Sequence, residues 1–295
     1  MIARAITFSC DGDVLLGVVH PAPSPTSGLG ILMVVGGGPQ YRVGGHRQSV
    51  LWSRALASRG YPVMRFDYRG MGDSHGAFRG FDDIDSDIRC AIDAFIAEEP
   101  SVREVLLWGE CDAAAAILFY AFRDPRVRRL ILLNPWARTE EGQARTLLRH
   151  YYFHRVLQRS FWSKVLRLEF SPWKALAGAA SLARRSSPKS TNGQAGARED
   201  NVALPSQEQL GLPERLLAGY QRFTGPILLI MSGRDMIARE FDDMLRGSVA
   251  WRRALASHSL TRHDIADADH TFSSAAQRDH VISVVFPWLA SSAGS

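Results

Sequence analysis

Cysteine is scarce in this chain of 295 residues, and the three that occur, Cys10, Cys90 and Cys111, follow no recognisable spacing. Three is not an even number for a disulfide framework, and no group of Cys and His residues has the spacing of a metal site. We therefore expect free thiols, a reducing compartment and no bound metal.

Long apolar runs are also missing. No stretch approaches the length of about 18 residues that a transmembrane helix needs. Residues 1–5 lack the apolar core of a signal peptide. These absences predict a cytoplasmic protein that does not span a membrane.

Motifs for nucleic acids and nucleotide cofactors are absent as well. The net charge of +5 and the pI of about 9.4 would suit a nucleic-acid partner, but the sequence has no zinc-finger or RNP motif. Its glycine clusters do not form the GxGxxG pattern of a dinucleotide-binding loop. We expect no nucleic acid, no cofactor and a small-molecule substrate.

The hydrophobic pattern alternates between strands and helices along most of the chain. Apolar or alternating runs predict strands at residues 3–8, 14–20, 29–35, 62–66, 105–108, 127–133, 226–231 and 260–265. Helical spacing is found at residues 48–59, 84–98, 112–122 and 274–289. This order indicates the α/β class, with a mainly parallel central sheet that helices cover on both faces.

An insertion interrupts this order. Residues 1–137 and 226–295 form the predicted core, and residues 138–225 form a helical cap that contains a flexible linker near 184–205. Residues 142–189 hold ten Lys and Arg and a single acid, Glu169. Three interpretations stay open: a solvated basic face on a cap that covers the pocket, recognition of an anionic substrate, or contact with an anionic membrane surface.

Residues 108–113 have the layout of a nucleophile elbow. They follow a predicted strand and open an Ala-rich helix, with Cys111 at the position of the nucleophile. A lone cysteine in apolar surroundings is more typical of a buried structural thiol. The helix N-terminus, however, favours the negative charge of a thiolate, which is the attacking form.

The residues that would serve such a nucleophile follow in order along the chain. Asp235 comes directly after a predicted strand, and His270 follows the last strand. The order nucleophile, acid, histidine indicates a catalytic triad of Cys111, Asp235 and His270. Backbone N–H groups of Asp112 and of Gly37 or Gly38 are the candidate oxyanion donors, since Pro39 has no N–H to give.

Four sequence segments together resemble a known family. They are residues 36–47, 66–74, 109–114 and 269–273. They resemble the α/β-hydrolase superfamily and, more narrowly, the exosortase A system-associated hydrolases of type 1, which are linked to bacterial exopolysaccharide gene clusters. The resemblance implies an α/β-hydrolase fold, with Cys111 as nucleophile, Asp235 as acid and His270 as base.

The expected function is hydrolysis of a carboxylic ester or thioester through this triad. Side chains after the glycine loop are candidates for substrate binding, namely Gln40, Arg42, His46 and Arg47. Two alternatives stay open: an acyltransferase that uses the same triad, and a non-catalytic member of the fold that binds a membrane or a protein partner. The elbow has Cys111 and Ala113 where the common pattern has serine and glycine.

Overall fold

A computed structural model describes residues 2–25, 27–38, 40–138, 210–257 and 259–291. Most of the predicted cap, including its basic segment and linker, lies outside the described residues. Among the residues that are described, no helix is long and apolar enough to cross a membrane.

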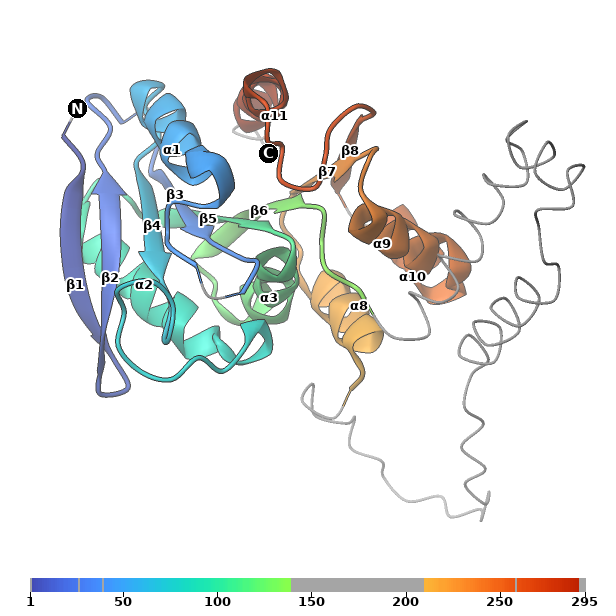
Figure 1. Ribbon diagram of the computed structural model, residues 1–295, viewed down its shortest axis with the longest axis horizontal. Helices are drawn as coiled ribbons and strands as arrows, with labels where there is room; N and C mark the ends of the chain where they lie inside the picture. The colour runs from blue at the N-terminus through green and yellow to red at the C-terminus, as the bar shows by residue number, and fades with distance from the viewer. Residues whose placement is uncertain (1, 26, 39, 139–209, 258, 292–295) are drawn as a thin grey trace, which may run out of the picture.

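One eight-stranded sheet organises the described chain (Figure 1). Its order is β1-β2-β4-β3-β5-β6-β7-β8. The strands are β1 (Arg4–Cys10), β2 (Asp13–His20), β3 (Leu29–Val34), β4 (Val63–Asp67), β5 (Glu104–Glu110), β6 (Val127–Leu133), β7 (Ile227–Ser232) and β8 (Leu260–Ile265). Six neighbouring strands run parallel, namely β4, β3, β5, β6, β7 and β8, and β2 pairs antiparallel with both β1 and β4. The mainly parallel α/β sheet predicted from the sequence is confirmed.

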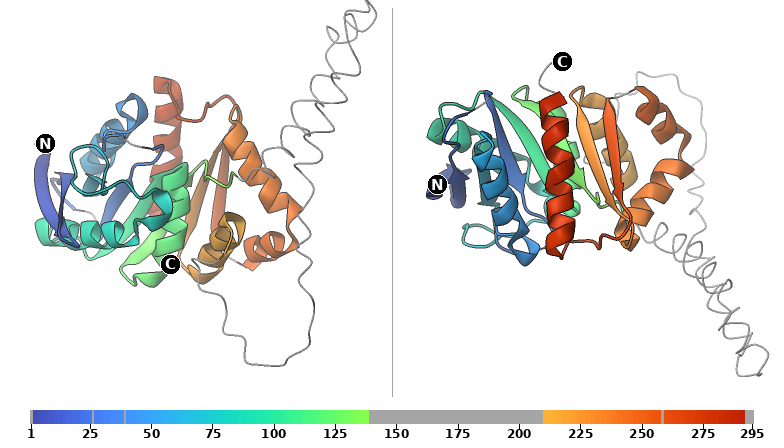
Figure 2. Two further views of the ribbon diagram at one scale, coloured as in Figure 1. Left: turned by 60° about the horizontal axis from the view of Figure 1, so that its bottom comes forward. Right: turned by 90° about the horizontal axis from the view of Figure 1, so that it is seen from above.

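Helices cover both faces of this sheet. They are α1 (Gln48–Ser58), α2 (Asp85–Glu98), α3 (Asp112–Tyr120), α8 (Leu212–Arg222), α9 (Met236–Gly247), α10 (Val249–Ser257) and α11 (Ala275–Ser291). Side chains of α1 and α11 belong to one buried cluster, and those of α2, α3, α8, α9 and α10 belong to the other. Figure 2 shows α1 and α11 side by side on their face of the sheet. Because β3 and β7 are buried along their whole length, their continuous apolar runs reflect cover from both sides.

Helix α8 lies within the stretch that the sequence analysis assigned to the insertion, yet it packs on α3. A side chain at Gly219 would place its Cβ 2.0 Å from the carbonyl oxygen of Leu118, so only glycine permits this close approach. The chain therefore returns to the core before β7, at α8.

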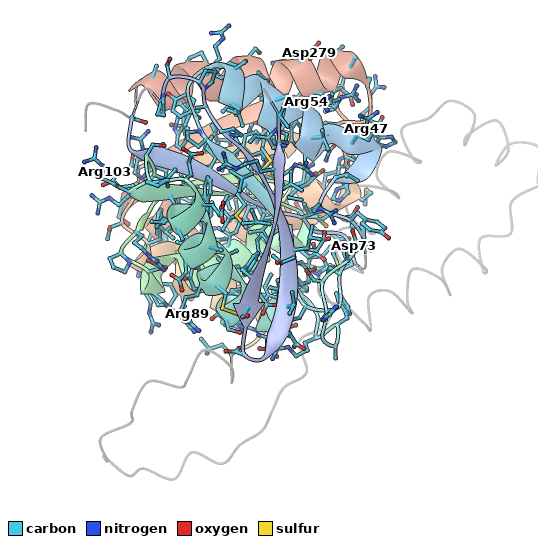
Figure 3. The ribbon with its side chains drawn as sticks, turned by 90° about the vertical axis from the view of Figure 1, so that its left-hand side faces the viewer. Arg47, Arg54, Asp73, Arg89, Arg103 and Asp279 are labelled. Atoms are coloured by element: carbon cyan, nitrogen blue, oxygen red, sulfur yellow. A yellow bond between two sulfur atoms is a disulfide. The ribbon has the colours of Figure 1, made fainter. Side chains whose placement is uncertain are left out.

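Cys10 and Cys90 are joined by a disulfide that links β1 to α2. Its yellow bond lies near the labelled Arg89 in Figure 3. The expectation of three free thiols is therefore wrong for this pair, and Cys111 is the free cysteine. The two partners are 80 residues apart, and only the packing of α2 beside β1 brings them together. With two of its three cysteines in a disulfide, the protein gives no support to the expected reducing compartment.

Candidate active site

Cys111 lies at the turn between β5 and α3. Its backbone has φ 59° and ψ −125°, a strained conformation for a residue with a side chain. Cys111 N–H donates to the carbonyl oxygen of Leu133, and its own carbonyl accepts from the N–H groups of Ala114 and Trp136. These bonds hold the turn, so the strain is maintained by the surrounding fold. The layout is that of a nucleophile elbow.

Small residues make the sharp turn possible. A Cβ on Gly109 would lie 2.5 Å from Cδ1 of Ile117 and 2.8 Å from the backbone of Ala113. The strand therefore needs glycine there, whereas Ala113 fits with only 1% of its surface exposed. Alanine in place of the second glycine of the common pattern leaves the elbow intact.

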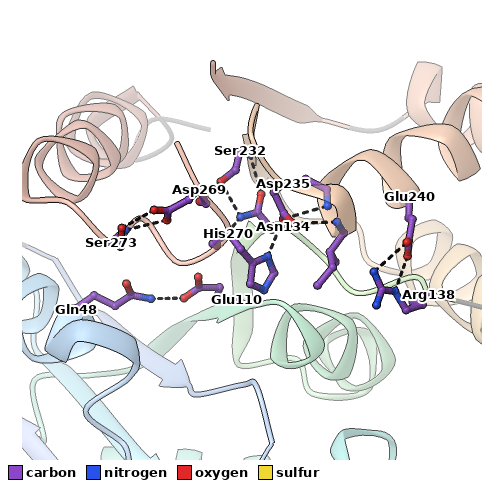
Figure 4. Close-up of polar contacts among 12 residues, drawn as sticks. Gln48, Glu110, Asn134, Arg138, Ser232, Asp235, Glu240, Asp269, His270 and Ser273 are labelled. Carbon is purple, nitrogen blue, oxygen red and sulfur yellow. Dashed lines mark hydrogen bonds and ion pairs between the residues drawn. The ribbon is translucent and has the colours of Figure 1, made fainter. Parts of the chain in front are cut away.

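His270 and Asp235 meet beside the elbow, at the carboxyl ends of the strands (Figure 4). Nδ1 of His270 lies 2.7 Å from Oδ2 of Asp235. The Asp235 carboxylate also caps α9, because it accepts from the N–H groups of Ile237 and Ala238. The helix cap fixes the carboxylate, and the carboxylate in turn fixes the imidazole ring.

The pKa of His270 reflects these neighbours. Burial alone would lower it, but the hydrogen bonds and negative charges of Asp235 and Cys111 outweigh burial and raise the pKa to about 10. The interaction with Cys111 brings the third member of the predicted triad against the imidazole. The structure thus brings Cys111, His270 and Asp235 together in one cluster.

Asn134 supports the loop that carries His270, and the sequence analysis did not single it out. Its Nδ2 donates to the carbonyl oxygen of His270 at 2.9 Å and to Oγ of Ser232 at 2.8 Å. Asn134 is fully buried and has φ 44°, in the left-handed region that asparagine tolerates. The feature of the sequence that could have indicated Asn134 is its position directly after β6.

Glu110 is a second acid at the site whose role the sequence analysis did not foresee. Gln48 Nε2 donates to Glu110 Oε2. Among the described residues, the other carboxyl oxygen, Oε1, is buried without a hydrogen-bond partner, as is Oε1 of Gln48. Burial raises the pKa of Glu110 to about 8, against the opposing charge of His270 and with help from Asp235 and Asp269. Glu110 is therefore mainly neutral at pH 7.

We expect Glu110→Gln to flatten the pH dependence of stability. The folded protein binds the Glu110 proton more tightly than the unfolded chain, whose pKa is 4.5. This group's contribution to stability is therefore complete below pH 4.5 and is lost as the pH rises to about 8. Glutamine has no such proton, and its amide can donate to the unpartnered oxygen of Gln48.

Urea unfolding at pH 5 and pH 8 measures the effect. The drop in unfolding free energy between these pH values should be smaller in Glu110→Gln than in the wild type by on the order of 3 kcal/mol. His270 contributes a further drop in both proteins. Glu104→Gln, at the exposed start of β5, is the matched control. Equal pH slopes for wild type and Glu110→Gln would contradict the assignment.

The glycine loop after β3 lies against the first turn of α3. Gly37 and Gly38 have φ of 95° and 78°, which favour glycine. Gly37 N–H donates to Oδ1 of Asp112 at 2.7 Å. The structure therefore brings the three predicted oxyanion residues together, with the Asp112 side chain on the Gly37 N–H.

The four candidate substrate-binding residues occupy different positions. Gln40 donates from Nε2 to the carbonyl oxygen of Gly36, and so holds the glycine loop. Arg42 pairs with Asp67 and Asp73. His46 and Arg47 have left-handed backbones and lie before α1, and Arg47 is exposed (Figure 3).

Arg138 is the last described residue before the insertion and lies at the edge of the site. It donates from Nε and from the second terminal nitrogen to the two carboxylate oxygens of Glu240, at 2.9 and 3.0 Å. Hydrogen bonding to Glu240 raises its pKa, and the charges of Asp235 and Cys111 contribute. A fixed positive charge thus stands near the elbow.

Within the described ranges, no group of three or more His, Cys, Asp or Glu could hold a metal ion.

Solved structures show the same fold at low sequence identity. An esterase from Pyrococcus furiosus is 13% identical over 99% of this chain and 91% of its own, with a TM-score of 0.62. The esterase domain of a Rhodothermus marinus protein is 19% identical over 98% of both chains, with a TM-score of 0.55. An alpha-beta serine hydrolase homologue from Coxiella burnetii is 13% identical over 98% of both chains, with a TM-score of 0.57.

Sequence comparison gives the family. No curated protein matches the chain. The family model described as serine aminopeptidase, S33, matches residues 50–272, which include the elbow, Asp235 and His270. The chain therefore belongs to the S33 serine aminopeptidase family and has the α/β-hydrolase fold.

Proposed function

We propose that this protein hydrolyses a carboxylic ester or thioester, with Cys111 as nucleophile, His270 as acid and base, and Asp235 as the residue that orients His270. The observation that carries the proposal is the strained elbow at Cys111, beside an imidazole that Asp235 holds at 2.7 Å. Two of the similar solved structures are esterases, which supports this reaction class.

The first half-reaction forms a thioester on the enzyme. A protonated imidazole beside the sulfur favours the attacking thiolate. His270 is protonated at neutral pH because its pKa is raised to about 10. The thiolate adds to the acyl carbonyl, and the tetrahedral intermediate then expels the alcohol or thiol. Because Nδ1 of His270 faces Asp235, Nε2 gives its proton to that leaving group.

The second half-reaction releases the acid. Neutral His270 now takes a proton from water at Nε2, and the hydroxide formed attacks the thioester. Collapse of the second tetrahedral intermediate breaks the carbon–sulfur bond and returns Cys111 to the thiolate. The carboxylic acid leaves, and His270 is protonated again.

Acyl transfer is the second candidate function. The free thiol at Cys111 favours it, since a thioester intermediate passes its acyl group to a hydroxyl as well as to water. The resemblance to exosortase A system-associated hydrolases supports a sugar hydroxyl of an exopolysaccharide precursor as the acceptor. Cytoplasmic location, and contact of the basic cap with an anionic substrate or an anionic membrane, stay predictions.

Selective labelling tests the proposal. The purified protein should form one covalent adduct with a panel of iodoacetamide and acyl thioesters, and peptide mass mapping should place it on Cys111. Labelling of His270→Ala should be slower by about 100-fold, in line with the usual contribution of a positioned acid or base. Cys10 and Cys90 are joined in a disulfide and should stay unlabelled. Failure of every reagent to label Cys111 would favour a non-catalytic binding role instead.

A further inference from the structure

The Asp112 carboxylate occupies the centre of the glycine loop. Gly37 N–H donates to its Oδ1 at 2.7 Å, and the backbone N–H groups of the glycine loop and of the start of α3 surround the carboxylate and favour its charged form. A Cβ built on Gly36 would lie 2.1 Å from Oδ1, so the loop backbone fits closely around the oxygen.

These donors are the ones that an oxyanion needs. In an α/β hydrolase the tetrahedral intermediate places its negative oxygen between the N–H of the residue after the nucleophile and an N–H of the loop after an early strand. Here those groups belong to Asp112 and to Gly37 or Gly38. A carboxylate oxygen has the charge and the hydrogen-bonding capacity of the oxyanion. It therefore takes the place of the intermediate, and both cannot occupy the loop together.

Burial of the Asp112 carboxylate at this position is unfavourable for its charged form. Burial raises the pKa of Asp112, although the hydrogen bond from Gly37 N–H and the other nearby backbone N–H groups act in the opposite direction. The position therefore favours the ionised carboxyl less than water does. A buried carboxylate whose hydrogen bonds do not offset the free-energy cost of burial is easier to displace than one whose hydrogen bonds do.

We infer that the Asp112 side chain is an internal blocking group that fills the oxyanion hole of the resting enzyme and must turn away before an acyl group reacts with Cys111. The inference rests on the proposed function, because a blocked oxyanion hole matters only if Cys111 attacks a carbonyl. Asp112 thus controls which reactions of Cys111 are fast. Attack on carbonyl carbon is slowed, and reactions that develop no oxyanion are not.

Two reagents separate these reactions. Iodoacetamide alkylates the thiolate by displacement of iodide and develops no oxyanion, whereas p-nitrophenyl acetate acylates it through a tetrahedral intermediate. Asp112→Ala removes the carboxylate and keeps the backbone N–H. We expect acylation of Cys111 in Asp112→Ala to be faster than in the wild type by at least about 10-fold, as a freed donor set implies. Because alkylation reports the thiolate itself, the ratio of acylation to alkylation isolates the oxyanion hole.

Two further variants complete the experiment. Asp112→Asn keeps the shape and removes the charge, and it should raise the ratio in the same direction even if Asp112→Ala is poorly folded. Asp85→Ala removes a carboxylate from the first turn of α2, where it pairs with Arg123 beyond the end of α3, and should leave the ratio unchanged. An unchanged or lower ratio in both Asp112 variants overturns the inference and leaves the proposed function standing. Absence of labelling by both reagents in every protein contradicts the proposed function, and the inference with it.

Discussion

Replacement of Cys111 by alanine is expected to lower kcat/KM for an ester or thioester substrate by at least about 1000-fold, because the chain then has no nucleophile at the elbow. The fold should be unaffected, since the thiol is small and the turn is held by backbone bonds to Leu133, Ala114 and Trp136. Initial rates with a series of p-nitrophenyl esters and acyl thioesters, together with circular dichroism, measure both effects.

The serine variant sharpens the test. Serine in place of Cys111 needs a neutral base, whereas the hydrogen bond and charge of Asp235 still raise the pKa of the neighbouring His270 and favour its protonated form. Cys111→Ser should therefore retain a small residual rate, lower than the wild type by about 100-fold, that increases as the pH rises. Full activity of Cys111→Ala on any substrate that the wild type turns over would show that the nucleophile is elsewhere.

The parallel strands were predictable from the sequence because burial on both faces leaves a simple pattern. Residues 127–133 coincide with β6, and the run at residues 29–35 ends within one residue of β3. Residues 260–265 coincide with β8, although this edge strand is mostly exposed. Helices α8, α9 and α10 were not predicted. The first lies in the stretch assigned to the cap, beyond the predicted linker near 184–205. Of the other two, α9 begins directly after Asp235 and α10 follows α9. Buried side chains of all three belong to the cluster that also contains α2 and α3, which identifies them as part of the core.

The members of the site were predictable to the extent that each lies on the turn or loop that follows a strand. The strand-turn-helix layout indicated Cys111, and chain order indicated Asp235 and His270. Contacts between side chains that are distant in the sequence left no such pattern. The Asn134 bond to the His270 carbonyl, the burial of Glu110 against Gln48 and the Asp112 carboxylate in the glycine loop all depend on how neighbouring elements pack. The Cys10–Cys90 disulfide likewise joins residues that are distant in the sequence and depends on how α2 packs beside β1.

Replacement of Asp235 by asparagine should reduce kcat/KM by about 1000-fold and change the protonation of His270. The carboxylate raises the His270 pKa and accepts the proton on Nδ1. An amide nitrogen at that place would face Nδ1 as a donor, which favours the tautomer with its proton on Nε2. With burial still acting, the pKa should fall from about 10 toward the ordinary value of 6.5 or below it.

The same substitution separates orientation of the histidine from stability of the fold. Asparagine is as good a helix N-cap as aspartate, so its oxygen can still accept from Ile237 N–H and hold the start of α9. Asp267→Asn, an exposed carboxylate on the loop that carries His270, is the matched control and should keep both the rate and the pKa. Imidazole NMR titration reports the His270 pKa directly. If Asp235→Asn left that pKa near 10, the raised value would have to come from Cys111 alone, and Asp235 would be a helix cap without a part in the reaction.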